Sequence, residues 1–123
     1  HAAKEKERDR ARRAGLAVAF SMAAMLALPS GVRAEELPAF RIEFKDGVIT
    51  PRRIEVPANR PFKLDLHNTG EAPAEFESHE LRREKVLAPH SASFLVIRRL
   101  DPGEYKFFDD FHLDAPPGVL VAK

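Results

Sequence analysis

The stretch LDPGEYKFFDDFHLDAPPGVLVA, residues 100–122, gives the strongest indication of the fold. It opens with the turn residues Asp101-Pro102-Gly103, and Tyr105 follows two positions later. A tyrosine placed in this way after a turn is typical of the tyrosine corner, which ties a Greek-key connection to the next strand. Residues 105–108 and 119–121 are rich in aromatic and β-branched side chains and predict two strands. This part of the chain therefore indicates a Greek-key β-sandwich.

In the preceding sixty residues, apolar and polar side chains alternate with a period of two residues in several segments. Phe40, Ile42 and Phe44 alternate with charged residues, which predicts a half-buried strand. The strand candidates are 40–45, 62–67, 91–97, 105–108 and 119–121. Turn residues separate them, and no long helical period is present; only Ser78–Lys85 suggests a short helix or an irregular loop. The sequence thus predicts an all-β domain.

The first third of the chain has a different composition. Residues 4–13 are almost all charged, residues 16–28 carry no charge, and Val32-Arg33-Ala34 ends in a small residue. This order is typical of a cleavable secretory signal peptide. The apolar run is shorter than the ~20 residues that a membrane-spanning helix needs. We therefore expect a signal peptide at 1–34 and one domain at 35–123, exported to the periplasm and in contact with the membrane only during export.

The charge and the cysteine content exclude several classes of function. The whole chain carries a formal net charge of +1, but residues 35–123 hold 13 Lys and Arg against 16 Asp and Glu, a net of −3. The positive charge leaves with the predicted signal peptide, so a basic nucleic-acid-binding surface is not expected. The chain has no Cys, which excludes disulfides and a cysteine-linked lipid anchor. No nucleophile–base arrangement or Gly-rich phosphate loop is present either.

Two segments resemble the cupredoxin family. The first runs from Tyr105 through Asp109 to His112 and on to a Gly-containing loop and a last strand, as in the metal loop of cupredoxins. The second, PFKLDLHNTG at 61–70, has the form of the cupredoxin strand that ends in Asn-x-Gly. The resemblance spans most of 40–123 and implies a cupredoxin-like Greek-key β-sandwich with a metal site at one end.

The chain departs from the blue-copper pattern, which uses two His, one Cys thiolate and usually an axial Met. Asp109 stands where the Cys would be, and Glu75 or its neighbour Ala74 stands where the first His would be. No Met follows His112. Without a thiolate the chain cannot form a blue-copper electron-transfer centre. One imidazole with carboxylates is a harder ligand set, which suits Cu(II), Fe or Mn better than Cu(I).

Within the cupredoxin relatives, EFES at 75–78 and FDDFH at 108–112 resemble one branch, the periplasmic cupredoxin-like component of bacterial ferrous-iron uptake operons. This resemblance implies an accessory protein that binds Cu(II), Fe or both, beside an iron permease and a periplasmic iron-binding protein. It implies the metal ligands Glu75, Glu77, Asp109 and His112, in an open site between loops. A ferrous-iron oxidase role is left open, although the chain offers no evident route to an electron acceptor.

Each candidate also has a plainer interpretation. Glu75 and Glu77 share one face of an extended segment, as exposed glutamates on an edge strand would. Asp109 could simply end a strand, and a single His in a loop is commonly solvated. Glu84 is expected to form solvated ion pairs with the neighbouring Arg82, Arg83 and Lys85, and at most to support the site from outside. The alternative function is a metal-free β-sandwich adaptor that docks on a transporter or on the iron-binding protein.

Overall fold

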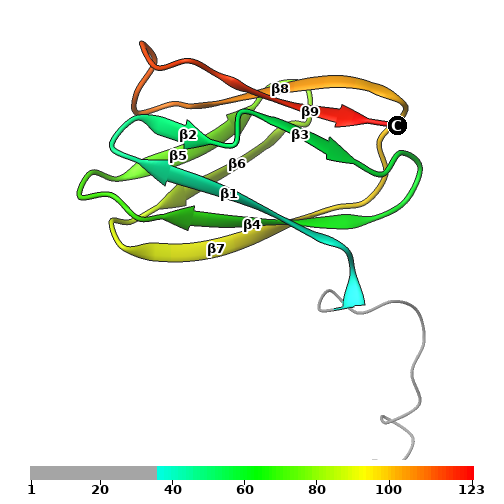
Figure 1. The fold of residues 1–123 in the computed structure, drawn as a ribbon, viewed down its shortest axis with the longest axis horizontal. Helices are drawn as coiled ribbons and strands as arrows, with labels where there is room; N and C mark the ends of the chain where they lie inside the picture. The colour runs from blue at the N-terminus through cyan, green and yellow to red at the C-terminus, as the bar shows by residue number, and fades with distance from the viewer. Residues whose placement is uncertain (1–35) are drawn as a thin grey trace, which may run out of the picture. The chain divides into compact units, whose positions relative to one another are not determined.

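A computed structural model describes residues 36–123, and the predicted signal peptide lies outside the described residues. Within this described part of the chain, nine strands form two layers (Figure 1). The strands are β1 (Ala39–Lys45), β2 (Val48–Thr50), β3 (Arg53–Val56), β4 (Phe62–Asn68), β5 (Ala74–Ser78), β6 (Arg83–Leu87), β7 (Ser91–Ile97), β8 (Gly103–Asp109) and β9 (Gly118–Ala122). Over this part of the chain no helix is long and apolar enough to cross a membrane.

The strands form two sheets. One has the order β2-β1-β4-β7, and the other has the order β3-β9-β8-β5-β6. The β1–β4 and β3–β9 pairs are parallel, and the other pairs are antiparallel. The chain leaves the first sheet after β2 and enters the second at β3, passing through a cis peptide bond between Thr50 and Pro51. The all-β sandwich predicted from the alternation is thus confirmed.

Alternate residues of every long strand fill the space between the sheets. On β4, Phe62, Leu64 and Leu66 are all 0% exposed, whereas the intervening residues are half-buried. In the other sheet Phe76 and Phe107 stack with ring centroids 5.3 Å apart. Each buried Phe or Leu stabilises the fold by about 1.5–3 kcal/mol relative to exposure. This apolar core holds a domain that has no disulfide.

The tyrosine corner predicted before β8 is present. The hydroxyl of Tyr105 donates a hydrogen bond to the carbonyl oxygen of Asp101 at 2.8 Å. In the same connection the amide of Asn59 donates to the carbonyl oxygen of Leu100 at 2.8 Å. These two bonds fix the end of the sandwich that lies opposite the loop containing His112.

The prediction for Ser78–Lys85 was wrong in part, because β5 and β6 form a β-hairpin there. β5 ends at Ser78, and β6 begins at Arg83 after a four-residue turn. The hydroxyl of Ser78 stabilises the turn by accepting a hydrogen bond from the Leu81 amide and donating one to the Lys106 carbonyl. β5 is also not an edge strand, since it lies between β8 and β6.

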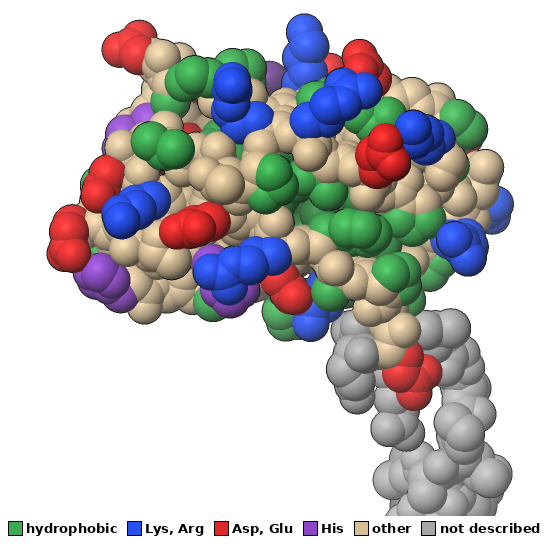
Figure 2. All heavy atoms as spheres, viewed as in Figure 1, with side chains coloured by type: hydrophobic (Ala, Val, Ile, Leu, Met, Phe, Trp, Pro, Cys, Tyr) green, Lys and Arg blue, Asp and Glu red, His purple; other side chains and the backbone are tan. Residues whose placement is uncertain are grey.

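The strand directions bring several loops to one end of the sandwich. β1, β4 and β8 end there, and β5 begins there, so loops 46–47, 69–73 and 110–117 are neighbours. The exposed acids Asp46, Glu71 and Asp114 belong to these loops. Figure 2 shows acidic and histidine side chains gathered at this end, on the left of the view, where β1 and β4 finish.

Candidate metal centre

Three carboxylates meet on the outer face of the β5–β6 hairpin. Glu75 and Glu77 alternate with the buried Ala74 and Phe76, so both side chains point away from the core. Glu84 lies directly opposite Glu77 in the antiparallel register. One carboxylate oxygen from each of the three glutamates lies within 4.8 Å of the others. Three oxygen donors at such distances can hold one cation if water completes its coordination shell.

The electrostatics of the cluster favour a shared positive charge. Burial, followed by hydrogen bonding to Asp110, raises the pKa of Glu75 above its usual value. Burial, followed by hydrogen bonding to Glu84, likewise raises the pKa of Glu77. The Oε2 atom of Glu77 is buried and has no hydrogen-bond partner, although the side chain as a whole is 17% exposed. The neighbouring carboxylates also repel one another, and a proton or a cation between them relieves this repulsion.

Glu84 is the residue whose role the sequence did not predict. Its expected ion pairs do not form: among the ion pairs of residues 36–123, none joins Glu84 to a Lys or an Arg. Arg83 instead donates from Nη1 to the carbonyl oxygen of Val96, at 2.8 Å. Among residues 36–123, the one ion-pair contact made by these three glutamates joins Glu77 Oε1 to Nδ1 of His79, at 3.7 Å. Glu84 therefore belongs to the cluster itself.

Asp109 and His112 form a second, separate unit at the end of β8. The Asp109 side chain is 0% exposed, and its Oδ1 accepts hydrogen bonds from the amides of Glu75 and Phe111, each at 3.0 Å. Its Oδ2 lies 2.7 Å from Nδ1 of His112. Both carboxylate oxygens are thus occupied inside the protein. The contact orients the imidazole and leaves Nε2 as the ring nitrogen that can bind a ligand.

Gly47 lies against the His112 ring. A Cβ at Gly47 would lie 3.2 Å from His112 Cδ2. The positive φ of Gly47, 88°, also favours glycine there. The loop after β1 is therefore shaped to the imidazole, whose side chain remains 28% exposed.

The structure does not bring the four predicted ligands into one site. Asp109 pairs with Phe76 in the β5–β8 register, so it faces the core with Phe76 and Ala74. Glu75 and Glu77 face the opposite side of the sheet. Of the two residues considered for the first-His position, Ala74 therefore points to the Asp109 side, and it has no ligand atom. A single site between loops, as the sequence suggested, is not the geometry observed.

The residues present do not fit a blue-copper centre. The Asp109 unit offers one imidazole nitrogen and a carboxylate that is already hydrogen-bonded, with no thiolate. The cluster of Glu75, Glu77 and Glu84 instead offers oxygen donors alone. Oxygen donors suit hard cations such as Fe(III) and, with water, Cu(II) or Mn(II).

The sequence is similar to a known protein family and to one bacterial protein. A family model described as a cupredoxin-like domain matches residues 16–122. An uncharacterized protein of Rickettsia prowazekii (strain Madrid E) is 38% identical over 81 residues, which are 66% of this chain and 65% of that protein. The chain thus spans about two thirds of the length of this relative.

Solved structures share the fold at low sequence identity. Reduced auracyanin from Roseiflexus castenholzii superimposes with a TM-score of 0.59 at 14% identity, covering 76% of this chain and 99% of auracyanin. The metal-binding domain of the Cu(I)-exporting P-type ATPase CopA of Streptococcus pneumoniae D39, solved with Cu(I), gives a TM-score of 0.61 at 14% identity. That match covers 69% of this chain and 84% of the other. At such identities these likenesses show the fold alone.

Proposed function

The chain belongs to the cupredoxin-like family, and from this premise we propose that it is a metal-binding accessory protein which holds a hard cation on Glu75, Glu77 and Glu84. One observation carries the proposal: oxygen atoms of the three carboxylates lie within 4.8 Å of one another. The protein would then bind metal without being a blue-copper electron carrier.

The chemistry of the cluster supports a cation rather than an empty surface. Three like charges on one sheet face destabilise one another unless a proton or a metal neutralises them. The buried, unpartnered Oε2 of Glu77 adds the desolvation cost of an unsatisfied acceptor. A bound Fe or Cu(II) ion would supply the positive charge, and these residues would fix its position.

We further propose that the protein works in the periplasm during bacterial iron uptake, beside an iron permease or a periplasmic iron-binding protein. The support is the EFES and FDDFH pattern and the apolar stretch at 16–28. Copper remains a candidate metal because a structural neighbour with this fold was solved with Cu(I). Delivery or storage of the ion suits the cluster better than oxidation, which would need an electron acceptor.

Asp109 and His112 are the second candidate site. The observation in its favour is the Asp109–His112 contact, which leaves Nε2 of His112 available to a metal. Only one donor is available there, so the carboxylate cluster is the better-supported site.

Calorimetric titration of the metal-free protein with Cu(II), and anaerobically with Fe(II), tests the proposal. We expect stoichiometric binding that Glu77→Gln and Glu84→Gln each weaken at least about tenfold. The matched control is Glu104→Gln, an exposed glutamate paired with Arg53 on another strand. If His112→Ala abolishes binding while the glutamate variants do not, the metal binds at the Asp109–His112 unit. No binding at millimolar metal would leave the metal-free adaptor function.

A further inference from the structure

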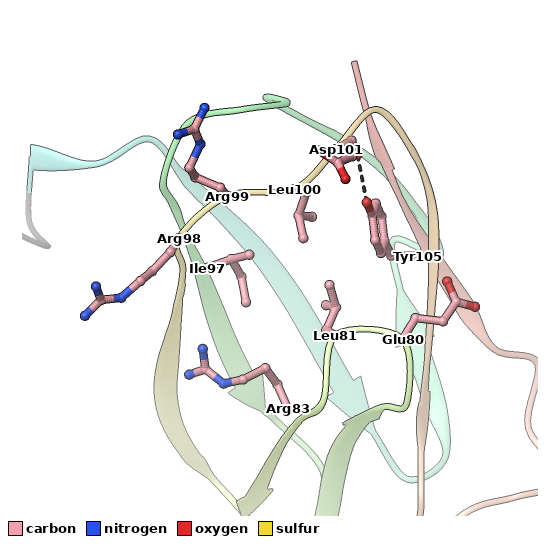
Figure 3. A pocket seen from close by; sticks show the side chains of 9 residues that line it. All are labelled: Glu80, Leu81, Arg83, Ile97, Arg98, Arg99, Leu100, Asp101 and Tyr105. Carbon is pink, nitrogen blue, oxygen red and sulfur yellow. Dashed lines mark hydrogen bonds between the residues drawn. The ribbon is translucent and has the colours of Figure 1, made fainter.

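Figure 3 shows a pocket of about 390 Å³ near the start of β8. Because His112 follows the end of β8, the pocket lies at the opposite end of the sandwich from the His112 loop. It is bounded by the turn between β5 and β6 and by the connection from β7 to β8. Its volume falls in the range of small-molecule sites. It contains no residue of the carboxylate cluster, so its function is separate from the proposed metal binding.

The centre of the pocket is apolar. Ile97, Leu100, Leu81 and Tyr105 converge there from four different segments (Figure 3). Ile97 and Leu100 are 4% and 8% exposed, so they form a fixed floor. The Tyr105 ring is held by its hydrogen bond to the Asp101 carbonyl. Above this floor the half-buried Leu81 and Tyr105 supply the apolar surface that a ligand would bury.

One wall of the pocket is basic and partly preorganised. Arg83 and Arg98 project to the same side from β6 and from the end of β7, with Ile97 between them (Figure 3). The half-buried Arg83 is held by the 2.8 Å bond from Nη1 to the Val96 carbonyl. A guanidinium has five N–H donors, so most of those on Arg83 remain available. Two guanidinium groups beside an apolar floor favour a carboxylate.

The other wall is acidic and limits the charge of the ligand. Glu80 and Asp101 line the pocket away from Arg83 (Figure 3). Arg99 also lines the pocket on the Asp101 side, so a second negative charge on the ligand is repelled chiefly where it lies near Glu80.

We propose that this pocket binds a single carboxylate carried on a short apolar chain. The carboxylate lies between Arg83 and Arg98, and the apolar chain lies against Leu81 and Tyr105. Such a group occurs in a free organic acid and at the C-terminus of a peptide that ends in an apolar residue.

Hexanoate is the first probe, titrated into the ¹⁵N-labelled protein and followed by amide NMR shifts. We expect saturable shifts at residues 80–83 and 97–105. 1-Hexanol, which has no charge, and adipate, which has two, are both expected to bind at least about fivefold more weakly. Equal binding of hexanol would overturn the carboxylate assignment, and tighter binding of adipate would overturn the single-charge assignment.

Arg98→Gln tests the basic wall at an exposed position, and Arg83→Gln tests it at the preorganised one. Each is expected to weaken hexanoate about tenfold, which is the loss of one charge-assisted contact. Arg52→Gln is the control, since it removes one exposed arginine charge outside the pocket. Equal weakening by Arg52→Gln would show nonspecific attraction and overturn the proposal. If Arg83→Gln fails to fold, Arg98→Gln decides.

A tripeptide, acetyl-Ala-Ala-Leu, distinguishes the two sources of the carboxylate. Binding tighter than that of hexanoate, lost when the C-terminus is amidated, would assign the pocket to a peptide end. Binding of hexanoate alone would assign it to a free acid. If neither probe gives saturable shifts at millimolar concentration, the pocket does not bind a carboxylate of this kind.

Discussion

Glu77 is one of the three proposed metal ligands, and its surroundings disfavour its ionised form. Its pKa is raised chiefly by burial and then by Glu84. A carboxyl with a raised pKa binds its proton more tightly in the folded chain than in the unfolded one. Its contribution to stability is therefore full below the usual value of 4.5 and is lost as the pH rises through the raised pKa. Without metal, ionised Glu77 weakens the fold at neutral pH.

Glu77→Gln should make the metal-free protein more stable at pH 7 while weakening its metal binding. The amide cannot ionise, so it removes the charge that lowers the stability of the parent protein. The difference in unfolding temperature between variant and parent should therefore shrink towards pH 4, where Glu77 is protonated. Thermal unfolding in chelator at several pH values measures this difference. Glu104→Gln is the control, and it should show neither the gain nor its pH dependence. A variant that is less stable than the parent at every pH would contradict this account of Glu77.

Asp109 has the opposite character, because its carboxylate is buried and fully hydrogen-bonded. Asp109→Ala would leave two backbone amides and the His112 ring without their acceptor. We expect a loss of about 2–4 kcal/mol in the free energy of unfolding. Urea denaturation measures it, with the exposed Asp114→Ala expected within about 0.5 kcal/mol of the parent. A loss below 1 kcal/mol would mean that water or a neighbour replaces the Asp109 carboxylate.

The sequence identified most of the side chains of the candidate site but not their grouping. Glu75 and Glu77 were placed correctly on one face, because alternation along a strand is a local property. Glu84 was assigned to ion pairs because its position opposite Glu77 depends on the register of a hairpin. That register is set by the turn that Ser78 stabilises. Charge pattern alone could not reveal it.

At the scale of the elements, the predicted strands are those with a strong apolar face. Residues 91–97 were predicted with the bounds of β7, and 62–67 nearly match β4. β6 was missed because only its last residue, Leu87, is buried, so its pattern reads as a charged loop. β2 and β3 were missed because they are three and four residues long. β2 pairs with the neighbouring β1 through a two-residue turn, so its shortness alone hides it, whereas β3 pairs with β9, which is distant in the sequence and which local patterns do not encode.

The β8–β9 pair depends on a close contact between a glycine and an aromatic ring. Gly118 pairs with Phe107, and a Cβ at Gly118 would lie 2.2 Å from Phe107 Cζ. Gly118→Ala should therefore displace the ring and destabilise the protein by about 1–3 kcal/mol or more. Phe107→Leu removes the clashing ring atom, so the double variant should lose less than the sum of the two single losses. Strict additivity in denaturant unfolding would show that the ring is not what constrains Gly118.

At the scale of the whole molecule, the two candidate binding sites share no residue, although Arg83 of the pocket and Glu84 of the cluster are neighbours on β6. The carboxylate cluster lies on the outer face of β5 and β6, and the arginine-lined pocket lies at the end where β5 finishes. Binding at one site therefore need not block the other. The domain has no disulfide and a modest size, so its stability has little margin. A ligand that binds only the folded state will then change the unfolding temperature measurably.

Metal should accordingly stabilise the protein, and more so at neutral than at acidic pH. At a free metal concentration of one hundred times Kd, the free energy of unfolding rises by about 2.7 kcal/mol, or roughly 10–20 °C in Tm. Protons compete for Glu75 and Glu77, whose pKa values are raised, so the shift should fall towards pH 5. Differential scanning calorimetry with and without metal measures the shift.

Arg98→Gln should keep the full metal shift because the arginine-lined pocket contains no ligand of the cluster. The double change Glu75→Gln with Glu77→Gln should abolish it. Loss of the shift in His112→Ala alone would instead locate the metal on the imidazole. Shifts of equal size at pH 5 and pH 7 would argue against carboxylates as the ligands, because ligands whose protons compete with metal must lose affinity as the pH falls.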